Sequence, residues 1–172
     1  MITVKKATQK DVRVLSRKLL TLLEDENSQV YTENVIKFGI PKAYVRKAFA
    51  EETLLKAVTL GKTTFYLALE NNEIVGFAQT IQRDSNTAVL DRIIIFPQYT
   101  RRGIGTQLLR QVLIDQERKG ISTVIVNTGK EETHARRFYE KSGFKKIKEA
   151  TLEAPWGKSL TLVVYEIRLR SA

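Results

Sequence analysis

The sequence predicts an α/β protein whose mixed sheet contains an antiparallel meander followed by a parallel β-α-β unit. Three observations support this fold class. Residues 63–95 contain three apolar, β-branched segments separated by short polar turns, which is typical of consecutive antiparallel strands. An amphipathic helical pattern follows over residues 104–118, and the apolar segment 123–127 comes directly after it. Because a strand–helix–strand unit within one sheet is almost always parallel and right-handed, segments 88–95 and 123–127 are expected to pair in parallel.

Length and composition are those of one globular domain. The chain has 172 residues without a repeat, a linker or a low-complexity tract, so residues 1–172 are expected to form a single domain. It contains neither a run of eighteen apolar residues nor the apolar core of a signal peptide, and we therefore expect a cytoplasmic protein without a membrane span. The lack of cysteine excludes disulfides and thiolate sites. The single histidine, His134, argues against a histidine-based metal cage, so no metal is expected.

The positive charge of the chain is concentrated in its second half. The net charge of +10 divides into +2 for residues 1–91, with 13 basic and 11 acidic side chains, and +8 for residues 92–172, with 16 and 8. An anionic cofactor bound by the second half would account for this excess. A nucleic-acid surface and a solvated basic surface without a partner are the alternatives, since composition alone does not separate them.

In the N-terminal third, helical patterns follow one short strand. Thr8 and Asp11 have the spacing of a capping box, which predicts the start of a helix. Pro41 fits the first turn of a later helix. The expected elements are a strand over 2–6, a helix from Thr8 to the acidic cluster 24–26, an ambiguous segment 27–40 with a candidate short helix from Thr32 to Gly39, and helices over 41–50 and 51–60.

The remaining segments give strand and helix signals in turn. Asn71 and Asn72 suit a tight hairpin turn because asparagine tolerates positive φ, and Gly76 in the next strand marks a candidate bulge. Pro97 ends the central strand, since proline cannot donate to a sheet ladder. The expected elements are strands over 63–70, 73–82 and 88–95, a helix over 104–118, a strand over 123–127, a helix over 133–141, and strands over 144–153 and 160–170.

The loop before Leu108 has the features of an anion site. Arg101 and Arg102 precede Gly103 and Gly105 at the start of the predicted helix. The first N–H groups of a helix are unpaired, and its dipole adds roughly half a positive charge there. The sequence therefore predicts that this loop binds a pyrophosphate, with an ordinary glycine turn as the alternative. The dinucleotide fingerprint is not matched, because Leu108 stands at its third glycine, and the Walker motif is not matched either.

A second motif lies in residues 135–144, which read Ala-Arg-Arg-Phe-Tyr-Glu-Lys-Ser-Gly-Phe. Ala135, Phe138 and Tyr139 share one helix face, which on its own is typical of a core-facing helix with a glycine cap. Together with the glycine loop, however, this segment flanks the predicted parallel strand pair. The two motifs resemble those of the Gcn5-related N-acetyltransferase (GNAT) family, whose members transfer an acetyl group from acetyl-coenzyme A to an amine. The resemblance extends from the first strand to the last.

The resemblance implies a GNAT-like fold with helices on both faces of the sheet and acetyl-coenzyme A as co-substrate. The pyrophosphate would lie on the loop 100–105, and the strand before the loop would pair its backbone with the pantetheine arm and the acetyl group. The cofactor-binding residues expected on this basis are Ile93, Ile94, Ile95, Arg101, Arg102, Gly103, Ile104, Gly105, Thr106, Asn127 and Tyr139.

Two positions depart from the family pattern. Thr100 stands where the family usually has Gln or Arg, and the neighbouring Arg101 or Arg102 would supply the charge instead. Glu132 stands where Asn is common, so that Asn127 or the threonine after it is the alternative contact for the pantetheine arm.

The resemblance also implies a set of catalytic groups. Tyr139 corresponds to the family's general acid, which would protonate the departing thiolate. Asp91 lies on the central strand where the family often has Glu. It is either the base, directly or through a water that it orders, or a member of a structural ion pair with Arg92 or a helix lysine. A backbone N–H of Ile94 or Ile95 would stabilise the tetrahedral oxyanion. His134 is interpreted as a surface residue rather than as the base.

The sequence therefore favours an N-acetyltransferase in which a primary amine attacks acetyl-coenzyme A directly. The acceptor is left open among small amines, polyamines, amino acids, antibiotics and protein amines. A basic nucleic-acid or ribosome-binding module and a coenzyme A sensor without catalysis are the rival functions, and a homodimer is a further expectation to test. Aromatic and basic residues are not interleaved, which argues against nucleic acid. Charge favours an uncharged or monocationic acceptor, bound between the insert 30–60 and the loop around Trp156.

Overall fold

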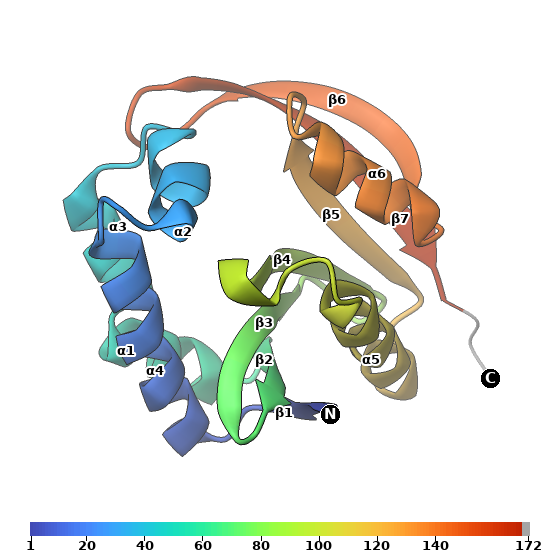
Figure 1. Ribbon diagram of the computed structural model, residues 1–172. Helices are drawn as coiled ribbons and strands as arrows, with labels where there is room; N and C mark the ends of the chain where they lie inside the picture. The colour runs from blue at the N-terminus through green and yellow to red at the C-terminus, as the bar shows by residue number, and fades with distance from the viewer. Residues whose placement is uncertain (170–172) are drawn as a thin grey trace.

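The computed structural model describes residues 1–169, apart from the side chains of residues 33 and 34. Its centre is a seven-stranded mixed sheet with the order β1-β2-β3-β4-β5-β7-β6 (Figure 1). The strands are β1 (Ile2–Lys6), β2 (Thr63–Glu70), β3 (Glu73–Gln82), β4 (Thr87–Ile95), β5 (Thr123–Gly129), β6 (Lys145–Glu153) and β7 (Ser159–Arg168). The helices are α1 (Gln9–Glu24), α2 (Gln29–Tyr31), α3 (Lys42–Phe49), α4 (Glu51–Thr59), α5 (Ile104–Arg118) and α6 (Thr133–Lys141), with a π-helical turn η1 (Thr32–Ile36) and a 3-10 turn η2 (Pro97–Tyr99).

The predicted fold class is confirmed. Strands β2, β3 and β4 form the antiparallel meander, and β4 and β5 pair in parallel across helix α5. Helices α1 to α4 cover one face of the sheet, while α5 and α6 cover the other (Figure 1). The predicted end of the last strand, residue 170, lies outside the described residues. Among the residues described, no helix combines the length and the apolarity needed to cross a membrane.

In the ambiguous segment 27–40 the helix begins at Gln29, three residues before the predicted start at Thr32. The side chain of Ser28 accepts a hydrogen bond from the N–H three residues later and so acts as the N-cap of α2. The capping box at the start of α1 is confirmed, because Thr8 and Asp11 each accept a hydrogen bond from the backbone N–H of the other. Local side-chain caps therefore determine where both helices begin.

A β-bulge at Asp91 determines which way the side chains of β4 point. Leu90 pairs with Thr80 and Arg92 pairs with Gln79, so Asp91 is an extra residue on β4. Strict alternation would place Arg92 on the same face as Leu90. With the extra residue, Arg92 instead faces helices α1 to α4. A second bulge lies opposite Ala68 and Leu69 on β3, next to the glycine at position 76 where the sequence predicted one.

Strands β4 and β5 pair over only four residues. The last parallel pair is Leu90 with Val126, and beyond it both strands continue for several residues without pairing with each other. Figure 1 shows the two strands diverging toward the side of the molecule where α2 and α3 lie. The backbone edge of β4 that faces β5 is therefore open along residues 91–95.

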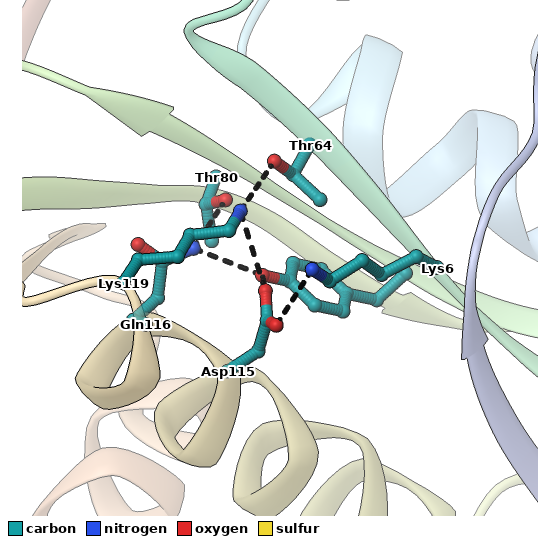
Figure 2. A network of polar contacts seen from close by, with 7 residues as sticks. Lys6, Thr64, Thr80, Asp115, Gln116 and Lys119 are labelled. Atoms are coloured by element: carbon teal, nitrogen blue, oxygen red, sulfur yellow. Dashed lines mark hydrogen bonds and ion pairs between the residues drawn. The ribbon is translucent and has the colours of Figure 1, made fainter.

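A buried polar network anchors helix α5 to the sheet (Figure 2). The Asp115 carboxylate accepts a hydrogen bond from the Tyr66 hydroxyl of β2 and pairs with Lys6 at 2.7 Å and with Lys119 at 3.3 Å. Gln116 donates to the Tyr66 hydroxyl at 2.9 Å and to Thr80 of β3 at 3.2 Å. Burial raises the pKa of Asp115, but the bonds from Lys6, Tyr66 and Lys119 outweigh burial and lower it overall.

We expect Asp115→Asn to lower the free energy of unfolding at pH 7 by about 1–3 kcal/mol, because a partly buried charged acceptor is lost. The folded-state pKa of Asp115 is depressed. Its stabilisation is therefore complete above the unfolded value of about 3.9 and is lost as the pH falls through the folded value. Urea denaturation at pH 7, 5, 4 and 3 should show the difference between the two proteins narrowing below about pH 4.

Glu117→Gln, on the same helix and without a side-chain partner among the described residues, is the matched control for this measurement. It should change the free energy of unfolding by less than about 0.5 kcal/mol. Equal stability of the two variants at pH 7 would show that the network does not hold α5 in place.

Candidate active site

A cavity of about 780 Å³ lies where β4 and β5 separate. Its size is within the range usual for small-molecule sites, which is about 300–1,000 Å³. Its walls come from α3, the segment after η1, the end of β4, the loop before α5, β5 and α6. The predicted site residues that line it are Asp91, Ile93, Ile94, Ile95, Arg101, Gly103, Ile104, Gly105, Thr106, Asn127 and Tyr139.

The glycine loop forms one end of the cavity and has a special backbone. Arg101 and Gly103 both adopt positive φ, +63° and +76°, and Gly103 is the N-cap of α5. The first hydrogen bond at this end of the helix runs from Gln107 to the carbonyl of Gly103 at 3.1 Å, so the N–H groups of residues 104–106 precede the helical ladder. Open N–H groups at the positive end of a helix make this loop suitable for an anion.

The two arginines of the loop have different environments. Arg102 forms a bidentate ion pair with Glu70 at the end of β2, with contacts of 2.6 and 3.1 Å, and it does not line the cavity. This pair lowers the pKa of Glu70 and raises that of Arg102. Arg101 lines the cavity and has no ion pair among the described residues, so it is the arginine left for a ligand. Thr100 bonds back to the carbonyl of Pro97 at 2.9 Å and closes the turn η2.

Tyr139 lies in the wall formed by α6. The side chain is 5% exposed, and its ring packs edge-on against Phe138 and Phe144. Its hydroxyl has no hydrogen-bond partner among the described residues, and the residue lines the cavity. Burial raises the pKa of the Tyr139 phenol, so it is fully protonated at neutral pH. The side chain can therefore donate a proton but has no internal acceptor that would compete for it.

Two groups of opposite charge stand side by side at the β4 bulge. Asp91 and Arg92 both line the cavity, and their carboxylate and Nε are 3.5 Å apart. The guanidinium of Arg92 stacks on the ring of Phe49 in α3, 4.2 Å from its centroid. Burial lowers the pKa of Arg92, and Asp91 opposes this effect. The sequence identified Asp91 but not Arg92 as a site residue, because the bulge that turns Arg92 toward α3 leaves no signal in the residue pattern.

The end of the cavity remote from the glycine loop is closed by contacts between distant segments. Lys37, after η1, pairs with Glu132 at 2.9 Å. The indole of Trp156 donates to the carbonyl of Phe38 at 2.9 Å and packs edge-on against Tyr44. The insert 30–60 and the Trp156 loop therefore meet beside the cavity, where the sequence placed the acceptor. Glu132, the second departure from the family pattern, is already neutralised by a lysine.

Thr128 and His134 also line the cavity. Thr128 of β5 has a buried Oγ1 without a partner, which leaves a hydroxyl available on the wall opposite β4. His134 is exposed at the rim, as the sequence suggested. Among the side chains that the structure describes, no group of three His, Cys, Asp or Glu is arranged to hold a metal ion.

Comparison with known proteins identifies the class to which this fold and cavity belong. The sequence matches the acetyltransferase (GNAT) domain over residues 27–157, and the chain belongs to that family. The ribosomal protein bS18-alanine N-acetyltransferase of Haemophilus influenzae is 37% identical over 79 residues, which are 46% of this chain and 53% of that protein. The chain thus spans about half the length of that relative.

A sequence and a crystal structure from Thermoplasma acidophilum are also similar. A spermidine N(1)-acetyltransferase is 26% identical over 120 residues, 67% of this chain and 71% of that protein. The crystal structure of the PaiA N-acetyltransferase in complex with coenzyme A has a TM-score of 0.70 at 20% identity, covering 98% of this chain and 99% of that chain. This structural likeness confirms the fold.

We expect Gly103→Val to weaken coenzyme A binding at least about tenfold, because a β-branched residue cannot keep the positive φ that directs the N–H groups toward an anion. The matched control is Gly120→Val, which also replaces a glycine of positive φ with open space around it but lies at the other end of α5. Titration calorimetry with coenzyme A should find its affinity unchanged in the control. Equal affinities in the two variants would rule out this loop as the coenzyme A site.

Proposed function

We propose that residues 1–172 form one catalytic domain, which transfers the acetyl group of acetyl-coenzyme A to a primary amine. The observation that carries the proposal is the order of groups along the cavity. The anion loop lies at one end, the open edge of β4 leads away from it, and the Asp91 carboxylate stands four residues before Ile95, roughly 13 Å along the strand. A long donor with an anionic end and a reactive end fits this order.

The residues present fit coenzyme A. Its pyrophosphate would bind the N–H groups of residues 103–106 and the guanidinium of Arg101. Its pantetheine amides would pair with the open edge of β4, and Asn127 and the unpartnered hydroxyl of Thr128 would contact the arm from β5. The coenzyme A reported with the similar PaiA enzyme supports the same choice of donor.

The chemistry begins with deprotonation of the acceptor, because a free alkylamine has a pKa of about 10.4 and must be neutral to attack. Asp91 would take this proton directly or through an ordered water. Attack forms the N–C bond. The oxyanion would then be stabilised by the backbone N–H of Ile93 rather than that of Ile94 or Ile95. Phe96 donates its own N–H to Val75 of β3, and successive N–H groups of a strand point in opposite directions, so the N–H groups of Ile93 and Ile95 face the open edge and that of Ile93 lies nearer to Asp91. As the C–S bond breaks, the thiolate would take the proton of Tyr139.

The charges of the cavity bear on the acceptor. The named relatives act on the alanine of a ribosomal protein and on spermidine, so both protein amines and polyamines occur among similar enzymes. Here the described carboxylates that line the cavity, Asp91 and Glu132, each already lie beside a cation. A polycation would therefore find no unpaired carboxylate in the described lining of the cavity. We therefore favour an acceptor with at most one positive charge.

We expect Tyr139→Phe to lower kcat and kcat/KM together by about 10²–10⁴-fold, with coenzyme A affinity unchanged, because the proton is needed only as the thiolate leaves. Thiol release with acetyl-coenzyme A and the best acceptor gives the rates, and calorimetry gives the affinity. Tyr165→Phe is the control. Tyr165 is also buried, but its hydroxyl accepts a hydrogen bond from Arg136 Nε at 3.0 Å and the residue does not line the cavity. Wild-type turnover of Tyr139→Phe would assign the proton to water instead.

An amine series tests the reaction itself. With acetyl-coenzyme A, primary monoamines should release thiol and give acetylated product detectable by mass spectrometry, at higher kcat/KM than spermine. The reason is the pairing of both cavity carboxylates with cations. A clear preference for spermine would contradict the proposed charge limit. If none of the amines is acetylated although coenzyme A still binds, the protein is a coenzyme A-binding protein rather than an enzyme.

A further inference from the structure

Arg92 has an unmet hydrogen bond inside the proposed acceptor end of the cavity. Its Nη1 is buried without any partner among the described residues, although 30% of the side chain as a whole is exposed. The ring of Phe49 covers one face of the guanidinium. Its contact with Asp91, 3.5 Å from Nε, is longer than the 2.7–2.9 Å usual for a charge-assisted hydrogen bond. Buried charged donors without acceptors are rare in folded proteins, so this one requires an explanation.

The protein itself offers one alternative partner. Gln79 lies directly opposite Arg92 in the strand register and on the same face of the sheet. Its Oε1 is also buried without a partner. A neutral amide oxygen could accept one hydrogen bond after a side-chain shift, but it would supply neither the charge nor the second oxygen that a guanidinium fork binds. A carboxylate ligand would supply both, and it would reach the guanidinium through the exposed part of the side chain that lines the cavity.

We propose that the acceptor is an α-amino acid with an apolar side chain, whose carboxylate binds Arg92 while its amino group lies at Asp91. The inference rests on the acetyl transfer proposed above. An α-amino acid carries its two charged groups on a single carbon, which matches the adjacent anion and cation at the bulge. Acetylation changes only the amine: nitrogen bonds to the acetyl carbon, the C–S bond breaks, the thiolate gains a proton, and the carboxylate stays on Arg92.

The residues that line this end of the cavity are the reason why we expect the acceptor to have an apolar side chain. This end of the cavity is lined by Phe38, Ile40, Tyr44, Val45 and Phe49. These residues come from the insert that precedes β2 and present rings and branched aliphatic groups, and the charged residues beside them, Lys37 and Glu132, are paired with each other. A side chain that leaves water for such a wall contributes to binding through burial of apolar surface.

The test compares acceptors that share one amine and one side chain. The first set is L-phenylalanine, which has a carboxylate, L-phenylalaninamide, which has a neutral amide in its place, and 2-phenylethylamine, which has neither. L-Leucine and its decarboxylated form, 3-methylbutylamine, form a second pair. Rates are expressed per concentration of free amine. We expect the acids to have about 10- to 100-fold higher kcat/KM than their partners, which is the effect of one charge-assisted pair.

Variants assign the preference to Arg92. Arg92→Met should remove it by raising KM for the acids more than for the decarboxylated amines, since the loss of the Asp91 partner affects all acceptors alike, and Arg92→Lys should restore only part of it because lysine lacks the fork. Arg110→Met on the exposed face of α5 removes the same charge away from the cavity and should keep the full preference.

The possible outcomes distinguish a failure of the inference from a failure of the acetyl transfer on which it rests. Turnover of all amines without a preference for the acids would overturn the inference and leave the transferase intact, as would equal rates for the acid and its amide. A lower melting temperature of Arg92→Met with equal losses for acids and amines would instead assign Arg92 to a structural pair with Gln79. Failure of every amine, with coenzyme A still bound in calorimetry, would overturn the transferase reaction and this inference together.

Discussion

The end of backbone pairing between β4 and β5 is the constraint on which the rest of the structure depends. Four parallel pairs hold the two halves of the sheet together, and beyond Leu90 and Val126 each strand keeps only its outer neighbour. The unpaired inner edges remain hydrogen-bonding groups that must find partners. A sheet that splits in this way creates both a cavity and a row of backbone donors and acceptors along its wall, before any side chain contributes.

The side chains around the split have separate tasks. Arg102 holds the loop to the end of β2 through Glu70, and this leaves Arg101 as the loop arginine that faces the cavity. At the other end of the same helix, the Asp115 network holds α5 against β1, β2 and β3. Helix α5, at whose start we propose the anion site, is thus fixed at both ends, so its N–H groups are directed before a ligand arrives, which reduces the ordering that binding requires.

The sequence was sufficient for the elements and for one end of the site. Capping residues, glycine turns and apolar periodicity are local signals, and they located α1, α5, α6 and the meander to within one or two residues. The glycine loop was visible for the same reason. The acceptor end was predicted only as a region between the insert 30–60 and the Trp156 loop, because its detail depends on contacts such as Lys37 with Glu132 and Phe38 with Trp156, which join residues about 95 and 118 positions apart. Arg92 was missed because alternation alone places it on the wrong face of β4.

The bulge at Asp91 also bears on how such a site could arise. Asp91 is supernumerary in the ladder, so its neighbours Leu90 and Arg92 would keep their present faces if it were absent. Deletion of the Asp91 codon would therefore keep the apolar side chains of β4 on their present face of the sheet, while removing the carboxylate and the local bend. Conversely, one codon inserted into a regular strand would introduce both at once. A carboxylate placed at a cavity in this way lies a single in-frame mutation away from an ordinary strand, and the core need not be redesigned.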